Sequence, residues 1–295
     1  MARRLIIVAG PTAVGKTDYA IELAQKYDSP VISCDSRQIY KEMKIGTAVP
    51  DDSQLAAVPH YFIRTNTIKE LYTAGRYEIE ALALMNKLFS QGHETLVMAG
   101  GSGFYVDAVC NGLDEIPPAD ETLRADLNKR LSEEGVESLR MDLKKLDPEA
   151  YATIDLANPQ RVLRALEVCL LSGRPFSSYK LKEPKKRDFE IEKICLIRPM
   201  EELRSRIAAR TAKMIDDGLV DEVKSLLPDR HYTALQTVGY REIFDWIDYE
   251  SGMEGDKLPK SLDEAVERII LNTRRYAKKQ ITWWKRDKSV KWIEL

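Results

Sequence analysis

The chain has few of the residues that build disulfide frameworks and metal sites. Its 295 residues include only four cysteines and three histidines. Cys34, Cys110, Cys169 and Cys195 are far apart and show no paired spacing, and the histidines are equally scattered. This distribution predicts a protein of a reducing compartment without a zinc site.

The sequence also lacks a long apolar run. No stretch approaches the roughly 18 to 20 apolar residues that a membrane-spanning helix needs. The first ten residues, MARRLIIVAG, place two arginines before apolar residues as a signal peptide does, but the apolar run is short and continues into a glycine-containing loop. We therefore expect a soluble cytoplasmic protein that does not associate with a membrane.

A large excess of charge of one sign is absent as well. The 45 lysines and arginines nearly balance 47 aspartates and glutamates, which gives a net charge of −2. Any affinity for nucleic acid must therefore come from a local basic patch. A hydrophobic fraction of 44% and a charged fraction of 31% are typical of a globular protein, and the length allows one large domain or two unequal ones.

Short apolar runs separated by helical patterns predict an α/β fold. Residues 17–28 and 76–90 show helical spacing. The candidate strands are LIIVAG (5–10), PVISCD (30–35), ETLVMAGG (94–101) and EKICLIRP (192–199). Buried strands that alternate with helices indicate a parallel sheet covered by helices on both faces.

The pattern changes between about residues 115 and 190. DEIPPADE opens a stretch of charged helical patterns, and KLKEPKKRDFE (180–190) closes it with lysines and a proline. We interpret this stretch as a mostly helical insertion bounded by linkers. The predicted domains are an α/β core made of residues 1–115 and 195–295, and a helical insertion domain made of residues 116–194.

The last predicted helix is amphipathic. SLDE (261–264) matches a capping box, in which Ser261 and Glu264 satisfy amides of the first turn. One stripe of the helix contains Leu262, Val266, Ile269, Thr273, Tyr276, Gln280 and Trp284. The other side contains Arg274, Arg275, Lys278, Lys279, Lys285 and Arg286. Such a basic face binds nucleic acid or is simply a solvated helix face.

A phosphate-binding loop follows the first predicted strand. GPTAVGKT (10–17) matches G-x-x-x-x-G-K-[ST] between a strand and a helix. In such loops the backbone amides face phosphate oxygens, the lysine adds a positive charge and the threonine can bind Mg²⁺. The fold expected is therefore like that of the P-loop NTPases. The loop leaves open whether its ligand is a nucleotide such as ATP.

The second predicted strand ends on a carboxylate, Asp35. NTPases usually have an acid at the end of a strand that helps to hold the metal, but LVMAGGSG ends in glycines. Asp35 could complete a Mg²⁺ shell, act as a general base, or be an ordinary turn or helix-cap aspartate. Its neighbours Ser36, Arg37 and Gln38 are suited to a polar partner.

Six segments, in this order, make the sequence resemble the tRNA dimethylallyltransferases, also called tRNA isopentenyltransferases, over essentially its whole length. They are GPTAVGKT (10–17), SCDSRQIYKEMKIGTAVP (33–50), GGSGFYVDAV (100–109), NPQRVLRALEV (158–168), TVGYREI (237–243) and AKKQITWWKR (277–286). Apart from the phosphate loop, each segment alone is a weak signal, but six in order are specific.

The resemblance implies transfer of a dimethylallyl group from dimethylallyl diphosphate to N6 of the adenosine on the 3′ side of the anticodon, position 37, in tRNAs that read codons beginning with U. The product is N6-isopentenyladenosine, and diphosphate is released. The implied partners are the tRNA anticodon stem-loop, dimethylallyl diphosphate and Mg²⁺. We further expect a monomer. Some eukaryotic relatives continue into a zinc-finger extension, whereas this sequence has no cysteine after Cys195, which resembles the bacterial type.

The resemblance also assigns site residues. Catalytic roles fall on Asp35 as general base, on Thr17 as Mg²⁺ ligand and on Arg210, which by itself would be read as a surface helix arginine. The diphosphate is expected to bind to Gly10, Pro11, Thr12, Ala13, Val14, Gly15, Lys16 and Thr17. The tRNA is expected to contact Asp35, Ser36, Arg37, Gln38, Ser102, Arg124, Gln160, Arg161, Val162, Leu163, Arg164, Gly239, Tyr240, Arg241, Lys278, Lys279, Gln280, Trp283 and Lys285.

Other functions remain open at the level of sequence. The main alternative is a P-loop small-molecule kinase, against which stand the missing strand-end acid and the basic last helix. A non-catalytic RNA-binding protein with a nucleotide switch would have no transfer activity. An enzyme that prenylates free adenine nucleotides would not need a basic patch, because a mononucleotide offers few phosphates.

Overall fold

The computed structural model describes residues 3–180 and 183–295. The chain forms two compact units: one contains the residues up to Asn111 together with Lys186–Leu295, and the other is Gly112–Lys185. The predicted boundaries lie further along the chain, by four residues at the first junction and by nine at the second. Leu181 and Lys182, part of the predicted closing linker, lie outside the described residues.

The first unit is built on a six-stranded parallel sheet in the order β3-β2-β4-β1-β5-β6. Its strands are β1 (Arg4–Ala9), β2 (Val31–Ser33), β3 (His60–Tyr61), β4 (Thr95–Ala99), β5 (Glu190–Ile197) and β6 (Lys291–Glu294). All described pairs are parallel, as the sequence predicts. The strands β3 and β6 at the two edges were not predicted, because they are short and partly exposed.

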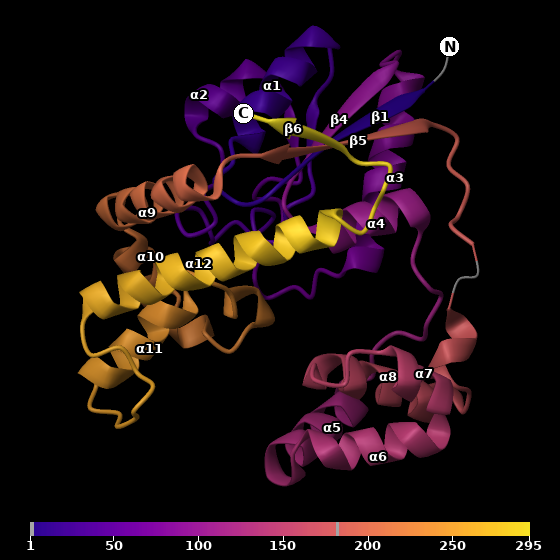
Figure 1. Cartoon of the computed structure of the whole chain (residues 1–295), viewed down its shortest axis with the longest axis vertical. Helices are drawn as coiled ribbons and strands as arrows, with labels where there is room; N and C mark the ends of the chain where they lie inside the picture. Colours follow the sequence, from indigo (N-terminus) through magenta and orange to yellow (C-terminus); the bar gives the residue numbers. More distant parts are fainter. Residues whose placement is uncertain (1–2, 181–182) are drawn as a thin grey trace. The chain divides into compact units, whose positions relative to one another are not determined.

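Both faces of the sheet are covered, as Figure 1 shows for the helices around β1 and β4. In β1, Ile6 and Val8 pack in a cluster with residues of the first helix, whereas Leu5 and Ile7 point to the opposite face and are equally buried. The helices of this unit are α1 (Lys16–Lys26), α2 (Asp52–Ala57), α3 (Ala74–Ser90), α4 (Gly103–Asn111), α9 (Met200–Asp216), α10 (Leu219–Ser225), α11 (Arg241–Glu250) and α12 (Leu262–Trp284). Short 3-10 turns occupy Leu227–Asp229 and Thr233–Leu235.

Strand β5 explains why the second domain boundary was placed too late. Its first half, EIEK, is charged and only partly buried, and its second half enters the core. Glu190 nevertheless pairs with Arg4 at the start of β1. The start of β5 could not be recognised in the sequence, because its charged and only partly buried residues look like those of a linker.

Helix α12 packs against α9, α11 and α4 (Figure 1). Ser261 caps its first turn by accepting a hydrogen bond from the Glu264 amide. The predicted capping box is only half present, because Glu264 accepts from the Lys260 amide instead of the Ser261 amide. Ile269, Gln280 and Trp284 of the predicted apolar stripe are buried.

The second unit is the predicted mostly helical insertion. It contains α5 (Glu121–Glu134), α6 (Val136–Leu146), α7 (Pro148–Thr153), α8 (Pro159–Ser172) and a 3-10 turn at Phe176–Tyr179. Its core is formed by leucines and other apolar residues of α5, α6 and α8. Pro159 and the side chain of Asn158, which accepts from the amides of Gln160 and Arg161, begin α8.

No helix in the described part of the chain is long and apolar enough to cross a lipid bilayer.

Candidate active site

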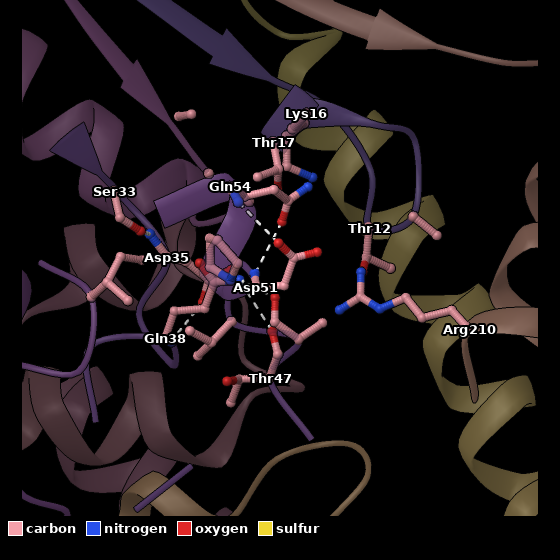
Figure 2. A pocket seen from close by; sticks show the side chains of 18 of the residues that line it. Thr12, Lys16, Thr17, Ser33, Asp35, Gln38, Thr47, Asp51, Gln54 and Arg210 are labelled. Carbon is pink, nitrogen blue, oxygen red and sulfur yellow. Dashed lines mark hydrogen bonds between the residues drawn. The ribbon is translucent and has the colours of Figure 1, made fainter. Parts of the chain in front are cut away.

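A cavity of about 780 Å³ lies where β1, β2 and β4 end and their loops begin. In parallel α/β sheets, this edge is where ligands bind. The cavity is lined by residues of the phosphate loop, of the segment after β2 and of α9 and α12. Figure 2 shows Asp35 on one side of it, opposite Thr12 and Arg210. The structure thus brings the predicted diphosphate site and the predicted base to one cavity.

The phosphate loop has the backbone conformation that its glycines permit. Gly10 and Gly15 have φ angles of 141° and 110°, in the region that disfavours side chains. A Cβ on Gly10 would lie 2.7 Å from the carbonyl oxygen of Leu196 in β5. The predicted loop residues that line the cavity are Thr12, Ala13, Gly15, Lys16 and Thr17.

The other three predicted loop residues do not line the cavity. Val14 is buried in the core cluster, and Pro11 is buried and has no N–H. The Val14 amide donates to the carbonyl of Pro11, and its carbonyl accepts from Arg198 Nε at 2.9 Å. These residues shape the loop, while the amides at the start of α1 are suited to binding an anion.

Arginines that follow β5 and lie on α9 support the loop from outside. Arg206 Nε donates to the Ala13 carbonyl at 2.8 Å, and Arg210 Nη1 donates to Thr12 Oγ1 at 3.1 Å. Burial lowers the pKa of Arg210, an effect that Asp35 opposes. Arg210 is therefore part of the cavity wall and not a free surface arginine.

Lys16 points back across its own loop. Its ammonium donates to the carbonyls of Gly10 and Pro11 at 3.0 and 2.8 Å. Burial, together with the positive charge of Arg210, lowers the pKa of Lys16 to about 8, although Asp35 acts in the opposite direction. An anionic ligand in the cavity would favour the charged form of this lysine.

The Asp35 carboxylate is held by the turn that follows it. Oδ1 accepts hydrogen bonds from the amides of Arg37 and Gln38 at 2.8 and 3.3 Å. This is also what an ordinary turn aspartate does, so the hydrogen bonds alone do not distinguish a base from a turn residue. Its position in the cavity wall, across from the phosphate loop, favours a chemical role.

Ser36 and Ser102 form a hydrogen-bonded pair beside Asp35. Ser102 Oγ accepts from the Ser36 amide at 2.9 Å and bonds to Ser36 Oγ at 3.0 Å. This pair joins the segment after β2 to the segment after β4. It places the two predicted RNA-contacting serines next to each other, although neither lines the cavity.

Gln280 and Tyr240 occupy positions that differ from the prediction. Gln280 is only 5% exposed. Its Oε1 accepts from the Thr12 amide at 2.8 Å and its Nε2 donates to the Gly101 carbonyl at 2.9 Å. Tyr240 is fully buried. Gln280 lines the cavity with both polar ends bonded to backbone, and the Tyr240 hydroxyl donates to Glu222, so we correct both assignments to structural roles.

Gly239 and Arg241 flank Tyr240 at the start of α11. Gly239 is buried, has a φ of 97° and donates its amide to Glu242 at 2.8 Å. Because Gly239 is buried and its amide is already bonded, we assign it a structural role in this turn in place of the predicted RNA contact. Arg241 is exposed and stays a candidate for RNA binding.

The basic face of α12 is exposed as predicted. It presents Arg274, Arg275, Lys278 and Lys279 to solvent, and Lys285 and Arg286, directly after the helix, are exposed as well. Trp283 is half-buried: its indole lies against Gly103, and Arg286 stacks over its ring at 5.5 Å. Closely spaced positive charges of this kind bind the phosphate backbone of a nucleic acid.

The predicted RNA-contacting residues of the second unit fall into two groups. Gln160 and Arg161 are exposed on the first turn of α8, whereas Val162 and Leu163 are buried in the core of that unit. The side chains of Val162 and Leu163 therefore cannot contact an RNA, and the prediction for them is corrected.

Arg124 and Arg164 share one buried carboxylate. Glu167, which is fully buried, accepts from Arg124 Nη2 at 2.7 Å and from Arg164 Nη1 at 2.6 Å through the same oxygen, Oε2. Both guanidinium groups are partly exposed. The ion pairs fix their orientation and leave other N–H groups for a partner.

Several cavity residues were missed from sequence. Arg206, Ala209, Lys213 and Met214 of α9, and Asp217 directly after it, line the cavity together with Arg210. Their spacing of three and four residues is a helical stripe, which could have been derived once Arg210 was singled out. Tyr276, which was assigned to the apolar stripe of the last helix, is 43% exposed and also lines the cavity.

The residues present fit a magnesium ion that is shared with a diphosphate. Among the described residues, no group of three or more His, Cys, Asp or Glu could hold a metal ion. The Thr17 hydroxyl nevertheless lines the cavity, as does Asp35. Mg²⁺ bound through one or two protein oxygens and substrate phosphates needs no larger cage.

A parallel α/β sheet, a phosphate loop at the carboxyl end of β1 and a carboxylate across the cavity define a P-loop-type enzyme for a phosphorylated substrate. A family model described as IPP transferase matches residues 38–287. The chain is 44% identical to tRNA dimethylallyltransferase 1 of Bacteroides thetaiotaomicron over 289 residues, which cover 98% of this chain and 91% of that protein. It is also 44% identical to tRNA dimethylallyltransferase 2 of Porphyromonas gingivalis, with 98% and 93% covered.

Solved structures agree with these relatives. The full-length tRNA isopentenylpyrophosphate transferase from Bacillus halodurans matches with a TM-score of 0.69 and 33% identity over 99% of this chain and 90% of that one. A eukaryotic dimethylallyltransferase acting on tRNA has the same fold, with a TM-score of 0.81 at 23% identity over 99% and 74%. The chain belongs to the IPP transferase family.

Proposed function

We propose that the chain transfers a dimethylallyl group from dimethylallyl diphosphate to N6 of the adenosine that follows the anticodon of a tRNA, and releases diphosphate. The observation that carries the proposal is the shared cavity: the phosphate loop and Asp35 line the same space from opposite sides. A tRNA substrate implies a cytoplasmic enzyme. The names of the relatives, tRNA dimethylallyltransferases, support this reaction.

The diphosphate binds at the phosphate loop. Amides at the start of α1 and the side chains of Lys16 and Arg210 face the negative charge that grows on the leaving group. The Thr17 hydroxyl would help to hold a Mg²⁺ ion, which would supply further positive charge against the leaving diphosphate. Lys16 must exchange its bonds to Gly10 and Pro11 for bonds to the diphosphate.

Asp35 acts on the acceptor. The lone pair of adenine N6 is delocalised into the ring, so N6 is a poor nucleophile. Asp35 takes one proton from N6 as the new N–C bond forms and the C–O bond to the diphosphate breaks. General base catalysis typically contributes about 10² to 10⁴-fold. Because Oδ1 accepts from two amides, the carboxylate is oriented before the substrate arrives.

The RNA is held away from the reacting atoms. A base in an anticodon loop must leave its stack to enter a cavity, at a cost of a few kcal/mol. The basic face of α12, with Lys278 and Lys279, supplies phosphate contacts that offset this cost. Arg124, Arg161 and Arg164 of the second unit are the further candidates for such contacts.

The test is the incorporation of labelled dimethylallyl diphosphate into an anticodon stem-loop with an adenosine 3′ of the anticodon, in Mg²⁺, by wild type and Asp35→Asn. Asparagine keeps an oxygen that accepts from the Arg37 and Gln38 amides but cannot take the proton. Label with wild type and a rate about 10² to 10⁴-fold lower with the variant would support both reaction and base.

Two results would contradict the proposal. If the Asp35→Asn enzyme transfers the label as fast as wild type, Asp35 is not the general base. A wild-type enzyme that leaves the stem-loop unlabelled but transfers phosphate from ATP to a small metabolite would instead be a P-loop kinase.

A further inference from the structure

A single carboxylate on α10 is surrounded by four hydrogen-bond donors from two other segments. Glu222 Oε2 accepts from the amides of Lys44 and Ile45 at 3.0 and 2.8 Å. Its Oε1 accepts from the amide of Gly46 at 3.0 Å and from the hydroxyl of Tyr240 at 2.7 Å. Hydrogen bonds to a charged acceptor are about twice as strong as neutral ones.

The segment bound by Glu222 is the loop of residues 43–48, which forms part of the cavity wall. Gly46 is required there, because a Cβ would lie 2.5 Å from the Tyr240 ring. Thr47 Oγ1 donates to the Met43 carbonyl at 2.6 Å, and Ala48 has a φ of 48°. Glu222 and Tyr240 therefore hold the loop in one strained conformation.

The loop in turn determines how Gln38 faces the cavity. Gln38 Nε2 donates to the carbonyls of Thr47 and Ala48 at 3.2 and 2.9 Å, and Figure 2 shows Gln38 beside Thr47. Carbonyl oxygens accept hydrogen bonds, and in the Gln38 side chain only the amide nitrogen donates them. The two carbonyls therefore fix which end of the side chain faces the loop. The group that Gln38 can still offer a substrate is its oxygen, Oε1, which only accepts hydrogen bonds.

We infer that Glu222 and Tyr240 are positioning residues that act through the 43–48 loop to keep Gln38 Oε1 aimed at an exocyclic amino group of the acceptor base. The inference rests on the proposed function. N6 of adenine carries two hydrogens: Asp35 takes one, and Gln38 accepts a hydrogen bond from the other. A 6-oxopurine such as hypoxanthine presents an oxygen at that place, and two acceptors repel each other. The loop thereby contributes to the choice of adenine.

The experiment compares two anticodon stem-loops that differ only in adenosine or inosine at the acceptor position. Their dissociation constants are measured for wild type, Tyr240→Phe and Tyr72→Phe. Tyr72 is a matched control, because it is also buried and its hydroxyl also donates to a carboxylate, that of Glu80, at 2.6 Å, whereas the loop of residues 43–48 is held by a different carboxylate, that of Glu222. A direct binding measurement does not depend on the rate of transfer.

Wild type is expected to prefer the adenosine stem-loop about tenfold or more, as a site built to bond an amino group does. Tyr240→Phe should reduce this preference by about three- to tenfold, the factor that one ordinary hydrogen bond represents. Glu222→Gln should reduce it further, because the carboxamide nitrogen opposes the loop amides. Tyr72→Phe should leave the preference unchanged, even if it lowers stability.

Equal binding of the two stem-loops by wild type would overturn the inference, as would an unchanged preference in both Tyr240→Phe and Glu222→Gln. A loss of preference in Tyr72→Phe as large as in Tyr240→Phe would reduce the effect to general destabilisation and would also overturn it. Prenyl transfer by wild type separates this failure from a failure of the proposed function: if the adenosine stem-loop is labelled, the function stands.

Discussion

Replacing Gln280 distinguishes the structural role of this residue from the RNA contact that the sequence predicted. Gln280→Leu keeps most of the side-chain volume but leaves the part-buried Thr12 amide and the buried Gly101 carbonyl without their partner. An unsatisfied buried backbone group costs about 1 to 3 kcal/mol, so we expect a loss of about 4 kcal/mol for the two. In a unit of roughly 200 residues this lowers Tm by about 10 °C.

The assay combines thermal unfolding, the KM for dimethylallyl diphosphate and the dissociation constant of an anticodon stem-loop. Because Thr12 belongs to the phosphate loop, we expect the KM to rise about tenfold, while the stem-loop binds within about twofold of wild type. Lys279→Ala, one residue away and exposed, is the matched control: it should weaken RNA binding without changing Tm. If Gln280→Leu instead keeps its Tm and loses RNA affinity, Gln280 contacts the RNA and our assignment is wrong.

Two further predictions concern charge. The pKa of Lys16 is lowered to about 8 in the free protein, so the ammonium that attracts a diphosphate is fully present below this pH and is lost as the pH rises through it. The affinity for dimethylallyl diphosphate should fall above pH 8, by up to about tenfold per pH unit, and Lys16→Met should abolish this pH dependence; a flat profile for wild type would contradict the assigned role. On the basic face of α12, Lys278→Ala and Lys279→Ala should each reduce the slope of log affinity for the stem-loop against log salt by about 1. An unchanged slope would show that these lysines lie off the RNA path.

The sequence contained the main elements of the α/β core. Buried strands such as β1 and β4 have continuous apolar runs, and the phosphate loop has a spacing that few other structures share. The edge strands β3 and β6 were not predicted, because they are short and lie at the edges of the sheet, where burial does not impose an apolar pattern.

Within the site, sequence patterns were reliable for residues whose role depends on local backbone. Gly10 and Gly15 need positive φ angles, Asp35 accepts from amides two and three residues later, and the lysines of α12 lie on the exposed side of an amphipathic helix. Each of these properties is set by neighbours in the chain.

Only the tertiary structure decided the roles that depend on partners distant in sequence. Gln280 meets the amide of Thr12, and Glu222 meets the loop of residues 43–48 together with Tyr240. In the sequence, Gln280 and Tyr240 look like polar residues of two motifs, and Glu222 resembles any glutamate on a surface helix. Their function follows from which buried donors and acceptors they satisfy, because a buried polar group must find a partner and the fold alone determines which partner is within reach.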